Sequence, residues 1–270
     1  MVLLKILAAL SVIQAAKSER WNSTTRKEFP FVVNVLRPDP HRPNKWHSLC
    51  HGALIKKNYV LTTAGCVFKK DDQYVIEVNE KKIHTDKIIT HESYRDSLYA
   101  NNYIAILELA QEVELDESVN VVNLPEPNEP IHKNRKSILT RSPHKGSKGK
   151  PLQFMETRIT NDISCAKKFS DRNKGLPQSR FCIAAGTDYR KGPLGLLLVQ
   201  KHESKTVLIG IIIRKLNLFT PISFYVDWID SKINGRTSTV DTIPTSTTKK
   251  YDDYRVSSND INRVLLRSGE

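Results

Sequence analysis

The sequence feature that most constrains the fold is a series of twelve short apolar segments with turn residues between them. Six of these segments lie between residues 29 and 109, and six lie between residues 136 and 222. Short runs rich in Val, Ile, Leu and aromatic residues are typical of β-strands, and their regular spacing is typical of a barrel or sandwich. The sequence therefore predicts an all-β protein with two successive sets of strands.

The first eighteen residues have the pattern of a secretory signal peptide. A single Lys5 precedes the apolar stretch Ile6–Ile13, and small residues follow, with cleavage expected after Ala16 or Ser18. The apolar run is too short to span a bilayer, so we expect a secreted protein with no membrane insertion. Cleavage removes two lysines and no acid, which lowers the formal net charge from +13 to +11.

Four further segments are distinguished by composition. Residues 19–28 form a polar N-terminal segment with the only N-glycosylation sequon, at Asn22. Residues 111–131 are acidic and proline-rich, as expected of a surface connector. Residues 223–233 carry apolar residues at helical spacing and predict a short C-terminal helix. Residues 235–270 are rich in Ser and Thr and predict a disordered tail.

The four cysteines indicate disulfides, because a secreted chain folds in an oxidising compartment. Four cysteines allow three connectivities, and here they fall into two close couples, Cys50/Cys66 and Cys165/Cys182. Pairing within each couple closes a loop of about fifteen residues, a constraint of roughly 3 kcal/mol in each case. No C-x-x-C spacing occurs, so we expect neither a metal site nor another cofactor.

Several motifs carry a resemblance to a known family. SLCHGALIKKNYVLTTAGC corresponds to C-G-G-(S/A)-L-I…V-L-T-A-A-H-C, and NNYIAILEL corresponds to N-D-I-A-L-L-x-L. EFPFVVNVL, HESY, VVNLP, LQFMETRI…SC, VLIGIII and FTPISFYVDWI occur in the matching order. Residues 29–234 thus resemble the trypsin-like (chymotrypsin-fold) serine proteases.

The resemblance implies two six-stranded antiparallel β-barrels, over about residues 29–115 and 132–222, followed by the short helix. It also implies an active site between the barrels. The pairs Cys50–Cys66 and Cys165–Cys182 match two of the family's usual disulfides.

The same resemblance places other residues in all three catalytic positions. The histidine slot is Gly65 and the aspartate slot is Tyr103. The nucleophile slot is Arg190 or Pro193, depending on the register, and no Ser, Thr or Cys lies between Asp188 and Gln200. Since losing one member of such a unit costs on the order of a million-fold in rate, the resemblance implies an inactive homologue.

Other features of the chain agree with this interpretation. His47 and His51 lie near Gly65 in sequence but have no evident Ser/Asp pair to act with. The family's I-V-G-G activation sequence is absent, and whether the chain is processed at the dibasic Arg26-Lys27 stays open.

Residues 132–150 form the most basic stretch of the chain. Seven cations with no acid, spaced by glycine and serine, predict a mobile loop that either wraps an anionic polymer such as a sulfated glycan or is a solvated basic loop with no specific ligand. The chain is exported and the stretch lacks interleaved aromatic residues, so we do not expect nucleic acid as its ligand. The seven predicted polyanion-binding residues are Lys133, Arg135, Lys136, Arg141, Lys145, Lys148 and Lys150.

Three hypotheses about function follow. The first is a secreted, inactive protease homologue that binds a protease, zymogen or inhibitor and modulates an extracellular cascade. The second is an anionic-glycan or matrix-binding module that uses residues 132–150. The third is a residual serine-type endopeptidase with a reactive serine outside the family slot.

Overall fold

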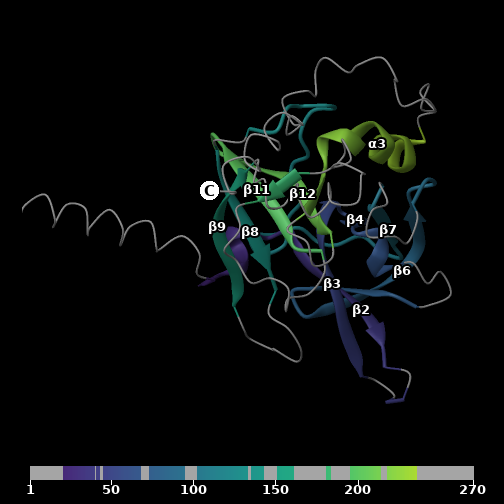
Figure 1. The fold of residues 1–270 in the computed structure, drawn as a ribbon. Helices are drawn as coiled ribbons and strands as arrows, with labels where there is room; N and C mark the ends of the chain where they lie inside the picture. The colour runs from purple at the N-terminus through teal and green to yellow at the C-terminus, as the bar shows by residue number, and fades with distance from the viewer. Residues whose placement is uncertain are drawn as a thin grey trace, which may run out of the picture.

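The fold is seen in a computed structural model of the chain (Figure 1). It describes residues 21–39, 41–42, 45–67, 73–94, 102–132, 135–142, 151–160, 181–183, 195–213 and 218–235. The predicted signal peptide and most of the predicted tail lie outside these residues. No helix in the described ranges is long and apolar enough to cross a membrane.

The first six apolar segments form a closed antiparallel barrel. Its strands pair in the ring order β2-β3-β4-β7-β6-β5, and β5 pairs with β2 to close it. The strands are β2 (Val32–Pro38), β3 (Trp46–Lys56), β4 (Tyr59–Thr62), β5 (Val75–Val78), β6 (Lys81–Thr90) and β7 (Ala105–Leu109).

The second six segments form another antiparallel barrel, closed because β8 pairs with both β11 and β9. Its strands are β8 (Lys136–Arg141), β9 (Leu152–Thr160), β10 (Phe181–Ile183), β11 (Leu197–His202), β12 (Lys205–Ile213) and β13 (Leu218–Pro221). The two-barrel architecture expected from the sequence is confirmed. An additional strand, β1 (Asn22–Thr24), comes from the polar N-terminal segment and pairs with β9.

Three apolar clusters hold the barrels together. One fills the first barrel, one fills the second, and the third lies between them. Side chains alternate across a strand, so on β3 Leu54 points into the first barrel while Ala53 and Ile55 join the cluster between the barrels. Both faces of such a strand are buried, which explains why its sequence reads as a continuous apolar run.

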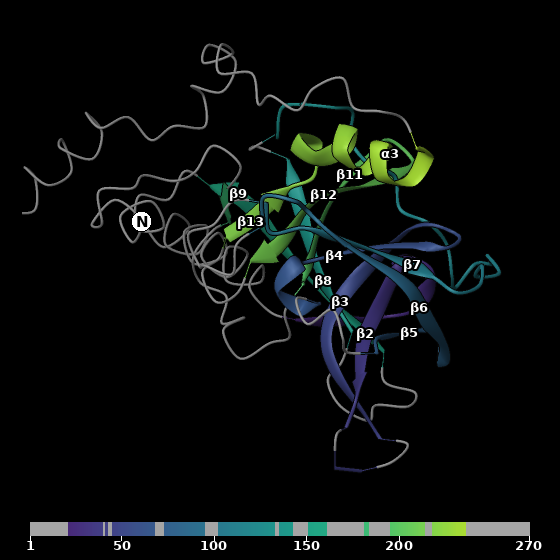
Figure 2. The ribbon, with the colours of Figure 1, turned by 90° about the vertical axis from the view of Figure 1, so that its right-hand side faces the viewer.

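The chain ends its second barrel in a short helical segment. A 3-10 turn, η4 (Ser223–Tyr225), leads into α3 (Val226–Asn234), close to the helix predicted over 223–233. The helix ends at Gly235, which has φ 65°, a left-handed conformation that glycine adopts without steric cost. Figure 2 shows α3 above the strands of the second barrel. Ile229 is 1% exposed and anchors α3 in the cluster between the barrels.

Candidate functional site

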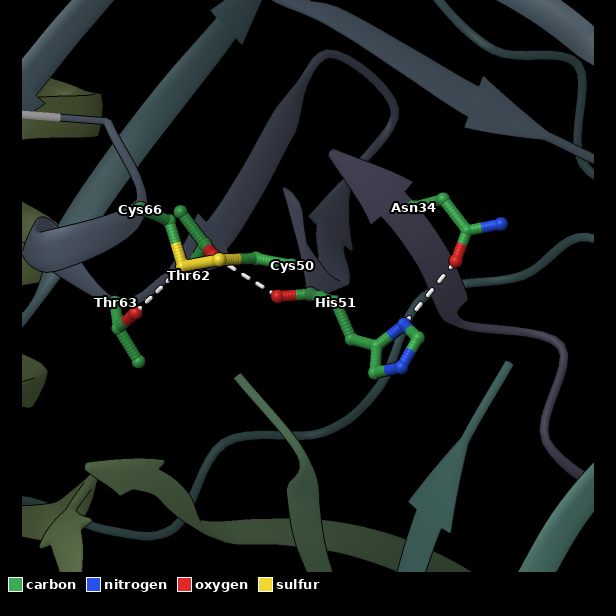
Figure 3. The surroundings of a disulfide bond; sticks show 6 residues. All are labelled: Asn34, Cys50, His51, Thr62, Thr63 and Cys66. Carbon is green, nitrogen blue, oxygen red and sulfur yellow. Dashed lines mark hydrogen bonds between the residues drawn. A yellow bond between two sulfur atoms is a disulfide. The ribbon is translucent and has the colours of Figure 1, made fainter. Parts of the chain in front are cut away.

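Gly65 lies in a short 3-10 turn, η3 (Ala64–Cys66), directly after β4. The Cys50–Cys66 disulfide ties this turn to β3, and Thr63 Oγ1 lies 2.8 Å from Cys66 Sγ (Figure 3). Thr62 Oγ1, one residue earlier in the chain, donates a hydrogen bond of 2.9 Å to the carbonyl of His51. These contacts fix the backbone where the resemblance places the catalytic histidine.

The side chain of Tyr103 occupies the space in front of Gly65. A Cβ placed on Gly65 would lie 2.2 Å from Tyr103 Oη and 2.6 Å from its Cζ. Tyr103 is 4% exposed, and the ring of Tyr94 packs edge-on against it at 5.3 Å between centroids. The two positions that the resemblance assigns to histidine and aspartate therefore meet in space, and the Tyr103 ring leaves no room for any side chain at residue 65.

Neither candidate for the nucleophile slot, Arg190 nor Pro193, lies in the described residues. The described chain resumes at Gly195, whose φ of 78° is in the left-handed region. A Cβ at Gly195 would lie 2.4 Å from the carbonyl oxygen of His51. Only glycine therefore allows the start of the β11 segment to pack this closely against β3 of the first barrel.

In the described residues, the side chains of the two histidines nearest to Gly65 in sequence contact an amide and a carboxylate. His51 has no exposed surface, and its Nδ1 lies 3.1 Å from Asn34 Oδ1. Asn34 Nδ2 in turn donates to Ser142 Oγ at 3.2 Å, so the amide separates the imidazole from this hydroxyl. His47 lies farther along β3, where its Nε2 is 2.9 Å from Asp39 Oδ2.

The prediction of one mobile basic loop over residues 132–150 is wrong for part of the stretch. Lys136 and Arg141 are the two ends of β8, because Ile138 and Leu139 between them are buried in the apolar clusters. Lys133, Lys145, Lys148 and Lys150 lie outside the described residues, and Arg135 directly precedes β8.

Both cations of β8 already have partners in the fold. Lys136 forms an ion pair with Glu156 on β9. Arg141 Nε donates to Gln153 Oε1 at 2.8 Å, and its guanidinium lies 3.9 Å from the centre of the Trp21 ring. Burial lowers the pKa of Arg141. Arg141 thus packs between the second barrel and the N-terminal segment, whereas the side chain of Lys136 stays 62% exposed beside Glu156.

Two surface cavities lie away from Gly65. The larger, about 760 Å³, has walls of mixed charge that include Glu28, Lys136 and Lys201. The smaller, about 430 Å³, borders the connector at Pro125 and Ile131. Both cavities lie where β8 begins and β11 ends, near Arg135 and His202. The opposite end of this strand pair, at Thr140 and Leu197, is the end near which Gly195 approaches His51.

The remaining predicted sites are the glycosylation sequon and the second cysteine couple. Asn22 is exposed on β1. Cys182 is disulfide-bonded, whereas Cys165 lies outside the described residues. Within the described ranges, no group of three or more His, Cys, Asp or Glu side chains is arranged to hold a metal ion.

The interlocking of Gly65 with Tyr103 is a feature that reasoning from the sequence missed. The available signal was a change in side-chain volume relative to the family motif. Where the motif has histidine this chain has Gly65, and where the motif has aspartate it has Tyr103. Such an exchange indicates direct contact only when the two positions are known to face each other.

Comparison with known proteins identifies relatives of the chain. The Trypsin family profile matches residues 20–229. Chymotrypsin-like elastase family member 1 from Felis catus is 26% identical over 213 residues, covering 70% of this chain and 80% of the relative. The clotting factor G beta subunit from Tachypleus tridentatus is 23% identical over 248 residues, covering 78% of each protein.

Among solved structures, the scabies mite inactivated protease paralogue S-I1 has a similar fold. Its TM-score is 0.65 at 21% sequence identity, over 80% of this chain and 99% of that chain. Similarity at this level of identity supports the two-barrel fold.

Proposed function

Since the chain belongs to the trypsin family, we propose that it is a secreted, catalytically inactive member that acts by binding an extracellular protease, zymogen or inhibitor. The observation that carries the proposal is the ring of Tyr103, which fills the space where a side chain at residue 65 would begin. The binding role follows from the protease fold, which without chemistry remains a rigid scaffold with variable loops.

The chemical argument starts from the general base. In the family mechanism a histidine accepts the serine proton, and a carboxylate orients and stabilises the resulting imidazolium. Gly65 offers no nitrogen, and the phenol of Tyr103 lacks the carboxylate's charge. His51 has no exposed surface, and its Nδ1 lies against the amide oxygen of Asn34, so its ring is not presented to a substrate. Loss of the base alone lowers the rate by on the order of a million-fold.

Secretion is supported by the leader-like segment at residues 1–18 and by the Cys50–Cys66 disulfide. Disulfides persist in oxidising compartments and are rare in the reducing cytosol.

A role in an extracellular protease cascade is supported by the names of two similar proteins. One is a subunit of a clotting factor, and the other is an inactivated protease paralogue. For this chain, we infer that the partner contacts the face where the two barrels meet, because Tyr103 has closed the catalytic position there without removing the fold around it.

The absence of catalysis is tested with a fluorophosphonate probe, which labels activated serines, on the purified secreted protein. We expect no labelling above that of the heat-denatured protein, with an active trypsin labelled in parallel as the control. Labelling of one serine in native protein, abolished by changing that serine to alanine, contradicts the proposal and supports the residual endopeptidase.

The partner is tested by affinity capture from the extracellular fluid with the full-length mature protein as bait. We expect a protease, zymogen or inhibitor that stays bound at about 0.5 M salt, where the screening length falls to a few ångströms. Capture of only glycan or matrix components that elute below this salt concentration contradicts the protein-partner proposal and supports the glycan alternative.

A further inference from the structure

The hairpin between β2 and β3 extends beyond the first barrel. Pairing of β2 with β5 ends at Leu36, and among the described strands β3 pairs with β4 only from Ala53 onward. Beyond these points, in the described residues, the two strands pair only with each other, at Arg37↔His47 and Pro38↔Trp46. Figures 1 and 2 show this hairpin projecting from the body of the molecule.

Asp39 organises the described part of the hairpin tip. Its Oδ1 accepts a hydrogen bond of 2.9 Å from the backbone N–H of His41, and its Oδ2 accepts one of 2.6 Å from Arg42 Nε. His47 Nε2 lies 2.9 Å from the same Oδ2, and the backbone N–H of Asp39 donates to the carbonyl of Lys45 at 2.8 Å. The backbone bond from His41, with those from Arg42 and His47, lowers the pKa of Asp39 to about 2.

The hairpin therefore hides its only acid and presents its basic groups. Asp39 is the single acidic residue between residues 37 and 49, and its side chain is only 4% exposed. The side chain of Arg42 is 57% exposed, and His41 and Lys45 are also exposed. Asp39 accepts its hydrogen bond from Arg42 Nε. The other four N–H groups of the guanidinium point away from this bond and can donate to a ligand.

An aromatic side chain lies next to these charges. Trp46 follows Lys45 directly, is half-buried, and packs edge-on against His84 of β6 at 6.4 Å between ring centroids. Tryptophan and arginine together are the residue types most enriched at the energetic centres of protein interfaces. A guanidinium fork matches the two oxygens of a carboxylate in geometry as well as in charge.

We propose that this basic hairpin tip (Arg42, Lys45 and Trp46, held by Asp39) is a docking surface for an acidic segment of a protein partner. Exposed ion pairs contribute at most about 1 kcal/mol each, so two exposed cations alone hold a polyanion weakly. The Trp46 ring beside these cations is only partly buried, and a polypeptide can place apolar side chains against it between its carboxylates. This docking proposal does not depend on whether the protein has protease activity.

The probe is a short fluorescein-labelled peptide of Glu and Gly with two Leu residues, and its binding to the full-length mature protein is measured by fluorescence anisotropy. The double variant Arg42→Gln/Lys45→Gln removes the two exposed cations of the tip. The matched control, Lys57→Gln/Lys81→Gln, removes two exposed cations elsewhere on the first barrel, so that the net charge of both variants is the same.

We expect the hairpin variant to bind the peptide at least about tenfold more weakly, and the control to stay within about twofold of wild type, at an ionic strength of about 0.15 M. Trp46→Ala keeps every charge and should also weaken binding several-fold. Equal weakening by the two charge variants, or no effect of Trp46→Ala, would show that only net charge acts and overturns the proposal.

Two further measurements complete the test. Lys45→Gln alone leaves every described contact of the Asp39 carboxylate intact, so it reports on docking even where the double variant folds poorly, as judged by circular dichroism. A heparin fragment of the same charge is titrated in parallel. Tighter binding of heparin than of the peptide, lost in the hairpin variant, overturns the assignment to a polypeptide and identifies a glycan site.

Discussion

At the scale of single residues, Gly65 and Tyr103 share one volume. The phenol lies where the first side-chain atom of residue 65 would stand, and Tyr94 packs behind it. Neither substitution is therefore independent of the other. Any side chain at residue 65, a histidine included, therefore requires the tyrosine ring to move or to be removed.

This coupling predicts a non-additive double-mutant cycle. Gly65→Ala alone should lower the free energy of unfolding by about 1–3 kcal/mol, because the new methyl group overlaps the Tyr103 ring. In a Tyr103→Ala background the same change should cost much less, since the ring is gone. Urea denaturation of wild type, both single variants and the double variant measures the coupling. Equal costs of Gly65→Ala in the two backgrounds contradict the shared volume.

At the scale of elements, the turn after β6 holds the C-terminal helix. His91 stacks on Trp228 of α3 at 5.1 Å between ring centroids, and Tyr225 packs against it edge-on at 5.7 Å. Glu92 accepts a hydrogen bond of 2.9 Å from Trp228 Nε1 and one of 2.5 Å from Lys232. A helix of nine residues is too short to be stable alone, so these contacts with the first barrel help to define its position.

The same contacts predict a pH-dependent stability. Burial, more than the nearby Lys232, lowers the pKa of His91, although Glu92 opposes the shift. The unfolded chain therefore binds the proton more readily than the folded protein. Folded stability is then fully retained above the ordinary histidine pKa of about 6.5 and declines as the pH falls below it.

The measurement compares wild type with His91→Phe, which keeps an aromatic ring against Trp228. When the pH is lowered from about 7.5 to 5.5, the melting temperature of the variant should fall by less than that of wild type, because residue 91 of the variant has no imidazole to protonate. Melting curves followed by circular dichroism check this, and the difference between the two proteins at pH 7.5 serves as the reference. Parallel loss in the two proteins contradicts the assignment to His91.

At the scale of the whole molecule, the N-terminal segment joins the two barrels. Residues 22–24 pair with β9 of the second barrel, and Phe29 then enters the cluster between the barrels, where its ring lies 5.9 Å from that of Phe154. Between them, η2 (Arg26–Glu28) forms a 3-10 turn. Arg26 donates to the carbonyl of Val32 at 3.2 Å, and burial lowers its pKa.

This arrangement bears on whether the chain is processed at Arg26-Lys27. A protease requires an accessible, extended segment, and here the backbone is folded into a turn with Arg26 held against β2. We expect trypsin, under native conditions, to leave this bond intact, with N-terminal sequencing as the readout. A synthetic peptide of residues 19–32, cut readily under the same conditions, is the control. Rapid cleavage of the native protein at this bond contradicts the role of the segment.

Much of the architecture is readable from local sequence. Apolar runs such as TVLIGIII at 206–213 predict strands because both faces of such a strand are buried, one inside a barrel and one between the barrels. The helix at 226–234 is readable from its apolar spacing and from Gly235, which terminates it. The assignment of Gly65 and Tyr103 to catalytic slots rests on the flanking motifs of the resemblance and stays a prediction.

Other features depended on residues far apart in the chain. The polar sequence at 22–24 shows no strand pattern. It forms a strand because it pairs with β9 through backbone hydrogen bonds, which do not depend on the side chains. Arg141 reads as one more cation of a basic loop, yet it stacks on Trp21. Lys136 likewise pairs with Glu156 across two strands.

The sequence by itself determined the all-β class and the positions of the twelve barrel strands, and it carried the resemblance from which Gly65 and Tyr103 are assigned to two catalytic slots. These depend on local hydrophobic pattern and backbone preference, which neighbouring residues carry. Only the tertiary structure decided that Tyr103 fills the space beside Gly65, that the N-terminal segment joins both barrels, and that Asp39 lies hidden among exposed basic groups. Each of these is a matter of packing and charge between side chains that folding alone brings together.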